Sequence, residues 1–136
     1  MNFRNTIKGF TLGLLILGTA IAANAQNDSK FLLLATNRTG TMENELNEAG
    51  GRGYRFTGTQ GGETAFGGRE AVVIMTRDPD SRRFRYILLA TSRTGTMQRE
   101  LDEIPPEYEV VGMTVFSSTF GGKEAAVILE AEITSD

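Results

Sequence analysis

The stretch LLATNRTGTM, residues 33–42, occurs a second time as LLATSRTGTM, residues 88–97, and this repetition decides the fold. The two copies differ only where Asn37 is replaced by Ser92, and they lie 55 residues apart. Self-similarity at a fixed spacing indicates two supersecondary units of one kind. Each unit alone would have a marginal core, so we predict one domain made of repeats 31–80 and 81–133.

In the first repeat the residues predict a strand, a helix and two more strands. The short apolar run 31–35 is typical of a strand buried on both faces. Thr41 can cap a helix that ends at the glycines 50–51. Residues 54–59 alternate as in a half-buried strand, and the β-branched run 71–75 favours a central one.

The second repeat follows the same order, with strands expected at 86–90, 108–116 and 125–132. Its helix is capped by Thr96 and stopped by Pro105 and Pro106. In each helix the apolar residues share one face, namely Met42, Leu46 and Ala49 in the first and Met97, Leu101 and Ile104 in the second.

These elements predict an α+β protein with a pseudo-twofold, six-strand arrangement, mixed but mainly antiparallel, and two helices on one face. A helix-containing crossover suits parallel first and second strands, with the third strand between them and antiparallel to both. Whether the strands form one continuous sheet or two packed halves stays open at this point.

The first 25 residues have the layout of a secretory signal peptide. A basic start with Arg4 and Lys8 precedes the apolar run 10–23, and Ala23-Asn24-Ala25 matches a signal peptidase site. The run is short for a membrane span, which needs roughly twenty residues. We expect cleavage after Ala25 and a loose lead-in at 26–30. The mature protein would then lie outside the cytoplasm, either in the periplasm or secreted, with no membrane span left.

Composition removes several chemistries from the list of candidate functions. The chain has no Cys, His or Trp, so it lacks a thiolate, the commonest general base and the commonest transition-metal ligand. Loss of Arg4 and Lys8 would leave 12 basic against 17 acidic residues. A net acidic chain argues against nucleic-acid binding, and we expect no cofactor.

The repeated Arg-Thr-Gly-Thr is the first candidate site, because it joins the end of a strand to the start of a helix. Backbone N–H groups, hydroxyls and an arginine there could bind a carboxylate, sulfate or phosphate. The structural alternative is a capped helix start whose arginine pairs with Glu43 or another acid. The anion-binding candidates are Arg38, Thr39, Gly40 and Thr41 in the first copy, and Arg93, Thr94, Gly95 and Thr96 in the second.

A second candidate is the sequence FGGREA, residues 66–71, echoed by FGGKEA, residues 120–125. Its aromatic and cationic residues, Phe66 with Arg69 and Phe120 with Lys123, could form a surface patch for a glycan or peptide. The structural alternative is a glycine hairpin loop whose phenylalanine covers the edge of the core.

Metal binding and catalysis are weakly supported. Asp78-x-Asp80-x-Arg82 faintly resembles a calcium loop but lacks its glycine and terminal Glu. A carboxylate pair such as Glu43 with Glu100 could be invoked for glycoside hydrolysis, which needs a cleft that two short helices hardly supply. We expect no metal, no catalytic residue and no enzyme activity.

The first repeat also resembles a known family. The sequence LNEAGGRGYRF, residues 46–56, is similar to the signature of the bacterial domain-of-unknown-function family 4177, in which a helix ends in Leu-Asn-x-x-Gly before a strand. The resemblance covers residues 30–132, with Pro105-Pro106-Glu107 displacing the glycines and Tyr54 and Tyr108 replacing the usual Trp. It implies strand-helix-strand-strand units and no particular activity.

The sequence therefore favours an exported, non-catalytic binding or interaction module whose envelope or extracellular ligand is unknown. Two alternatives stay open: an envelope structural or stress protein that self-associates through its sheet edges, and a small carboxylate-based hydrolase. The oligomeric state is not determined by the sequence.

Overall fold

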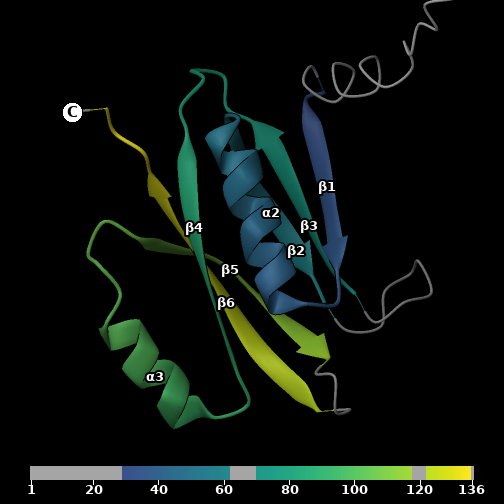
Figure 1. The fold of residues 1–136 in the computed structure, drawn as a ribbon, viewed down its shortest axis with the longest axis vertical. Helices are drawn as coiled ribbons and strands as arrows, with labels where there is room; N and C mark the ends of the chain where they lie inside the picture. The colour runs from purple at the N-terminus through teal and green to yellow at the C-terminus, as the bar shows by residue number, and fades with distance from the viewer. Residues whose placement is uncertain (1–28, 62–69, 118–121, 136) are drawn as a thin grey trace, which may run out of the picture.

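Each half of the chain folds as strand, helix, strand, strand. A computed structural model describes residues 29–61, 70–117 and 122–135 (Figure 1). The elements are β1 (Phe31–Thr36), α2 (Thr39–Gly51), β2 (Tyr54–Gln60), β3 (Ala71–Arg77), β4 (Phe84–Thr91), α3 (Thr94–Asp102), β5 (Glu109–Ser117) and β6 (Lys123–Glu132). The predicted α+β class and the two β-α-β-β repeats are confirmed.

The strands form two separate three-stranded sheets, one from each repeat. Sheet A has the order β1-β3-β2 and sheet B the order β4-β6-β5, so the third strand of each repeat is central, as predicted. All four pairings are antiparallel rather than mixed. Both repeats also have a register shift at the same place, at Phe56–Gly58 in β2 and at Val110–Gly112 in β5.

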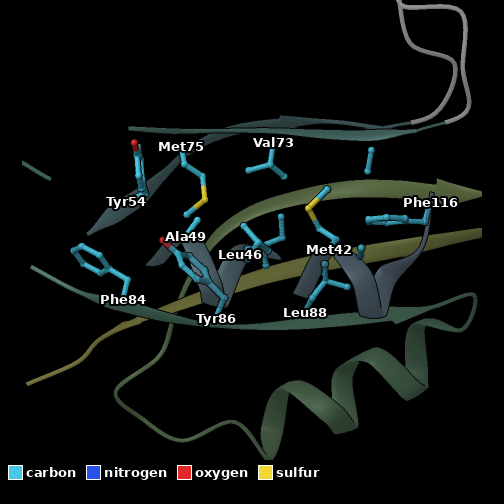
Figure 2. Packing of buried hydrophobic residues seen from close by; sticks show 13 residues of the cluster. Met42, Leu46, Ala49, Tyr54, Val73, Met75, Phe84, Tyr86, Leu88 and Phe116 are labelled. Atoms are coloured by element: carbon cyan, nitrogen blue, oxygen red, sulfur yellow. The ribbon is translucent and has the colours of Figure 1, made fainter. Parts of the chain in front are cut away.

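The layers run in the order sheet A, α2, sheet B, α3 (Figures 1 and 2). Helix α2 contacts β1 and β2 of its own sheet and, more extensively, β4 of the other sheet, whereas α3 contacts β4 from the opposite side. The prediction of two helices on one face, related by a pseudo-twofold axis, is wrong. The repeats are instead stacked head to tail, because the helix side of the first packs against the bare side of the second sheet.

The core lies around α2 and is shared by both repeats (Figure 2). Met42, Leu46 and Ala49 project from α2 between the side chains of the two sheets. Sheet A contributes Tyr54, Val73 and Met75, and sheet B contributes Phe84, Tyr86, Leu88, Phe116 and Ile128. Full burial of a large apolar side chain contributes about 1.5–3 kcal/mol, so this shared core holds the two repeats together.

Helix α2 lies directly against the free edge of β4. A Cβ atom at Gly50 would overlap the carbonyl oxygen of Phe84, so only glycine allows this approach. Asn47 Nδ2 donates to the Tyr86 carbonyl at 2.9 Å, and the Tyr86 N–H donates to Asn47 Oδ1 at 2.8 Å. The Leu88 N–H donates to Glu43 Oε2 at 2.8 Å. These bonds pair edge groups of β4 that would otherwise lack partners.

Strand β1 is not buried on both faces, and that prediction is wrong. It is an edge strand, and Phe31 and Leu33 are 58% and 56% exposed. The alternate residues Leu32 and Leu34 pack against the core. The run looked doubly buried because all its residues are apolar, but no repeat is stacked on its outer face.

The helices begin three residues earlier than predicted, so Thr41 and Thr96 are not the N-caps. Arg38 and Arg93 occupy the cap positions, and neither makes a side-chain cap bond. Helix α3 also ends at Asp102, which leaves Ile104 beyond it. Within the described ranges, no helix has the length and apolar character needed to cross a membrane.

Candidate functional site

The repeated Arg-Thr-Gly-Thr forms the same corner in both repeats. The Arg38 N–H donates to Thr36 Oγ1 at 3.2 Å, and the Arg93 N–H donates to Thr91 Oγ1 at the same distance. The arginine carbonyl then accepts the first helical bond from the methionine N–H four residues later, at 3.0 Å in each repeat. The threonine before the motif therefore turns the chain from strand to helix.

Among the described residues, the second copy of this corner lines a pocket. The pocket lies between α3 and the outer face of sheet B and has a volume of about 380 Å³. This volume is within the range of small-molecule sites. Its lining residues come from the β4–α3 corner, from α3 and from the two other strands of sheet B: Thr91, Ser92, Arg93, Thr94, Met97, Gln98, Leu101, Met113, Lys123, Ala125 and Val127.

The inside of the pocket is mainly apolar, with Met97 and Leu101 of α3 facing Met113 and Val127 of sheet B. Met113 is 67% exposed, so this side of the pocket is open to solvent. Hydroxyl groups lie on the side of the corner, where Thr91, Ser92 and Thr94 contribute to the lining. An apolar interior with a few polar groups at one end is the usual composition of a small-molecule site.

The charged groups of the pocket are both cationic. Arg93 and Lys123 line it, and no carboxylate is among its lining residues. Neither cation forms an ion pair with any residue in the described part of the chain. The site therefore combines an apolar body with positive charge, which suits a ligand that carries the opposite sign.

The residues of the first copy of the motif do not line this pocket. Arg38, Gly40 and Thr41 are exposed and Thr39 is partly buried, on a surface where a Cβ at Gly40 would meet nothing within 4 Å. Arg38 does not pair with Glu43, as the structural alternative expected, because Glu43 is turned toward Leu88 of β4. In the second copy Gly95 is exposed and Thr96 is partly buried, and neither lines the pocket.

The structure brings together parts of both candidate sites. Arg93 and Thr94 come from the Arg-Thr-Gly-Thr motif, and Lys123 comes from the aromatic and cationic patch. The other members of that patch, Phe66, Arg69 and Phe120, lie outside the described residues. Sequence reasoning missed the apolar half of the pocket, since Met97, Leu101 and Val127 have the pattern of ordinary core residues.

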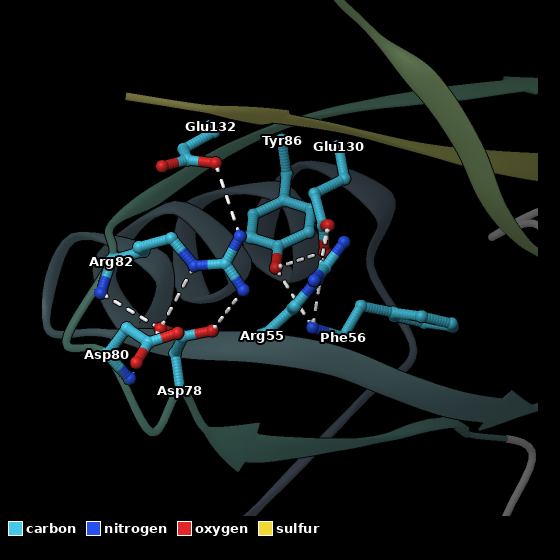
Figure 3. A network of polar contacts seen from close by, with 8 residues as sticks. All are labelled: Arg55, Phe56, Asp78, Asp80, Arg82, Tyr86, Glu130 and Glu132. Atoms are coloured by element: carbon cyan, nitrogen blue, oxygen red, sulfur yellow. Dashed lines mark hydrogen bonds and ion pairs between the residues drawn. The ribbon is translucent and has the colours of Figure 1, made fainter. Parts of the chain in front are cut away.

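A buried polar cluster that the sequence did not reveal joins the two repeats (Figure 3). The Tyr86 hydroxyl donates to Glu130 Oε2 at 2.9 Å and accepts the Phe56 N–H at 3.0 Å. Arg55 Nε donates to Glu130 Oε1 at 2.9 Å. Burial, followed by the negative charge of Glu130, raises the pKa of Tyr86 well above its ordinary value. The phenol therefore stays protonated and links β2 to sheet B.

The turn between the repeats is held by a second polar cluster around Asp78 (Figure 3). Asp78 Oδ1 accepts Arg82 Nη2 at 2.9 Å, and Oδ2 accepts the backbone N–H groups of Asp80 and Arg82. The hydrogen bond from the Arg82 side chain lowers the pKa of Asp78 below its ordinary value. With these oxygens engaged, the turn has a structural role. Within the described ranges no group of Asp and Glu gathers to hold a metal ion.

Comparisons with models of protein families, with curated proteins and with solved structures found no match to this chain. The likeness to family 4177 therefore stays a prediction from the sequence.

Proposed function

We propose that this protein is an exported, non-catalytic binding module that holds a small amphipathic anion in the pocket beside α3. The ligand class is an apolar chain or ring that carries one carboxylate or sulfonate. The observation that carries the proposal is the pocket itself, which is apolar inside and has Arg93 and Lys123 as its only charged lining residues.

The proposal follows from two energetic terms. An apolar ligand body would remove the faces of Met97, Leu101 and Met113 from water, at about 25 cal/mol for each Å² buried. The anionic group would form charge-assisted hydrogen bonds with Arg93 or Lys123, each contributing about 1.5–3 kcal/mol. Together these terms favour an amphipathic anion over a purely apolar or a cationic molecule.

The first repeat supports the assignment by contrast. Met97 and Leu101 are partly buried, whereas the equivalent residues Met42 and Leu46 are both at 0% exposure. The space beside them is occupied by sheet B, including Phe116 (Figure 2). A ligand could not enter there, so we assign binding to the second repeat alone.

Export and the absence of catalysis enter the proposal from the sequence. Residues 1–25 have the layout of a signal peptide, and a chain without His or Cys has no ordinary nucleophile–base pair. A hydrolase built on Glu43 has little support, since its Oε2 accepts the Leu88 N–H within the interface of the repeats. A binding role uses the groups that the pocket does present.

Calorimetric titration of the purified protein with decanoate tests this proposal. Decanoate is expected to bind, whereas decyltrimethylammonium, with the same chain and the opposite charge, is not. Replacing both cations, Arg93→Gln with Lys123→Gln, should weaken decanoate binding about 10- to 100-fold.

Arg38→Gln is the matched control, because Arg38 occupies the equivalent corner of the first repeat and does not line this pocket. It should leave decanoate affinity unchanged. Equal affinity for the two probes, or a double variant that binds decanoate like the original protein, would contradict the proposed site.

A further inference from the structure

We propose that the outer face of sheet A, together with the free edge of β1, binds α3 of a second copy of this chain in a head-to-tail stack. The chain already contains one interface of this kind, in which α2 lies against β4. The inference does not rest on the proposed ligand, because it is argued from the outer face of sheet A and the edge of β1, which do not line the pocket.

The exposed face of sheet A is equivalent, pair by pair, to the face of sheet B that α2 and sheet A cover. Leu33 pairs with Ile74 across β1 and β3, and Leu88 pairs with Ile128 across β4 and β6. Phe31 occupies the place of Tyr86 in the same register. The two faces therefore present the same kind of apolar surface in the same geometry.

The two equivalent faces differ in solvent exposure. Phe31, Leu33 and Ile74 are 58%, 56% and 43% exposed, whereas Tyr86, Leu88 and Ile128 are 3%, 9% and 0% exposed. A cluster of exposed large apolar residues on one sheet face is typical of an interaction site. The internal interface shows what covers such a face in this chain, which is a helix of the repeat that precedes it.

The backbone edge of β1 is uncovered as well, which is a second and independent observation. In β4 the outward N–H and C=O groups of Tyr86 and the N–H of Leu88 are bonded by Asn47 and Glu43. Among the described residues, no side chain bonds the equivalent groups of Phe31 and Leu33. An uncovered edge strand with apolar side chains is a template for association.

Helix α3 carries acceptors at the positions that α2 uses. Gln98 and Asp102 correspond to Glu43 and Asn47, and both are exposed. The two side chains bond to each other, since Gln98 Nε2 donates to Asp102 Oδ1 at 2.8 Å. This bond leaves Gln98 Oε1 and Asp102 Oδ2 as acceptors. These two oxygens can accept the N–H groups of Leu33 and Phe31 from a second copy.

The interface between copies would be weaker than the internal one. The residues equivalent to Tyr86, Glu130 and Arg55 are Phe31, Thr76 and Glu109, so the buried ion pair has no counterpart. Helix α3 has 9 residues against 13 in α2, and so lacks the turn that contains Gly50. We therefore expect reversible association, with a dissociation constant in the micromolar range, about 10⁻⁶ M.

A stack of this kind is heterologous, since the face and the helix are different surfaces of one chain. Unless the rotation closes a ring, such contacts generate open chains rather than a dimer. The second copy would also cover Met97 and Leu101, in the way that sheet B covers Met42 and Leu46.

Engineered disulfides test this arrangement cleanly, because the chain has no cysteine of its own. Leu33→Cys combined with Gln98→Cys places one thiol on the face and one on the helix, where Glu43 approaches Leu88 in the internal interface. Under mild oxidation the double variant should give a ladder of dimers, trimers and larger species. Each single variant should stay largely monomeric on a non-reducing gel.

A dimer from Leu33→Cys alone would show face-to-face pairing and would overturn the head-to-tail arrangement. No crosslinked species from the double variant at a protein concentration well above the expected dissociation constant would overturn association altogether. The decanoate titration uses different residues, so either proposal can fail without the other.

Sedimentation velocity gives a second measurement without introduced cysteines. The weight-average sedimentation coefficient should rise with concentration for the unmodified protein and stay at the monomer value for Leu33→Glu. Ile133→Glu is the matched control, since Ile133 is a 36% exposed apolar residue outside both surfaces and its change should leave association intact. An unmodified protein that stays monomeric at all concentrations would contradict the proposal.

Discussion

Helices α2 and α3 start from the same corner and contain the same Thr-Gly-Thr-Met, yet they end up in different environments. Helix α2 lies between two sheets, with Met42 and Leu46 fully buried. Helix α3 packs on one sheet only, and none of its residues is buried. The burial of a repeated element therefore depends on what is stacked over it.

The same comparison holds for the strands that precede the helices. Strand β4 has α2 along its edge and the shared core on the face that carries Tyr86 and Leu88. In β1 the outer edge and the equivalent face, which carries Phe31 and Leu33, are exposed. Tandem repeats that stack in one direction always leave one bare face at each end. In this chain the two ends are the outer face of sheet A and the open side of α3, where we place the two proposed functions.

Truncation of equivalent leucines gives the largest expected difference between the helices. Leu46→Ala should lower the free energy of unfolding by about 4 kcal/mol, because the fully enclosed site cannot collapse around the cavity. Leu101→Ala should cost about 1 kcal/mol, since half-buried Leu101 lines a pocket already open to water. Urea unfolding followed by circular dichroism measures both values. Equal costs would contradict the different burial of the two helices.

The edge bonds of β4 should give a smaller difference. Asn47→Ala leaves the N–H and C=O of Tyr86 without their partners in the interface, which should cost about 2 kcal/mol. Asp102→Ala, at the equivalent position on α3, removes only an exposed bond to Gln98 and should stay within about 0.5 kcal/mol. The same urea titration measures this pair. A large effect of Asp102→Ala in the monomer would show that α3 makes contacts of the α2 kind within one chain.

The internal order of each repeat could be predicted from the sequence because local patterns determine it. Helical spacing of Met42, Leu46 and Ala49, the alternation after Tyr54 and the β-branched run at 71–75 each belong to one element. The central position of the third strand followed from chain connection rules. These features depend on neighbouring residues, which the sequence displays directly.

The stacking of the repeats could not be predicted in the same way. Phe31 and Leu33 have the same apolar character as Tyr86 and Leu88, so no local pattern says which pair meets α2. Gly50 against Pro105 is the one clear sequence difference, because a close helix–strand approach needs glycine. It indicates that, within one chain, the first helix lies tightly against another strand.

The candidate site was predicted in part for a related reason. Arg93, Thr94 and Lys123 are polar residues in loops and corners, where functional groups stand out. Met113 looks like a core residue, but no further repeat is stacked on it, and it is an exposed wall of the pocket. A sequence shows which side chains are apolar, whereas the fold decides which of them stay accessible.

Strands β1 and β4 differ in polarity where β1 has Phe31 and β4 has Tyr86. Exchanging these residues gives the smallest expected change in the free energy of unfolding. Tyr86→Phe installs the residue that β1 has at Phe31, and it removes the bonds of the hydroxyl to Glu130 and to the Phe56 N–H. We expect a cost of about 1–2 kcal/mol at neutral pH. Phe31→Tyr, on the exposed face, should change the free energy of unfolding by less than about 0.5 kcal/mol.

The pH dependence of this variant identifies the cause of the cost. Burial and the Glu130 charge raise the pKa of Tyr86, so its contribution to stability is fully present below pH 10.0, the ordinary tyrosine value. Above that pH the unfolded chain releases the phenol proton and the folded chain keeps it, so stability falls. Urea midpoints at pH 7 and at about pH 11 should therefore lie further apart for the unmodified protein than for Tyr86→Phe. Parallel shifts in the two proteins would mean that Tyr86 is not the residue whose proton is retained, and that the hydroxyl contributes no more in β4 than it would at the exposed position in β1.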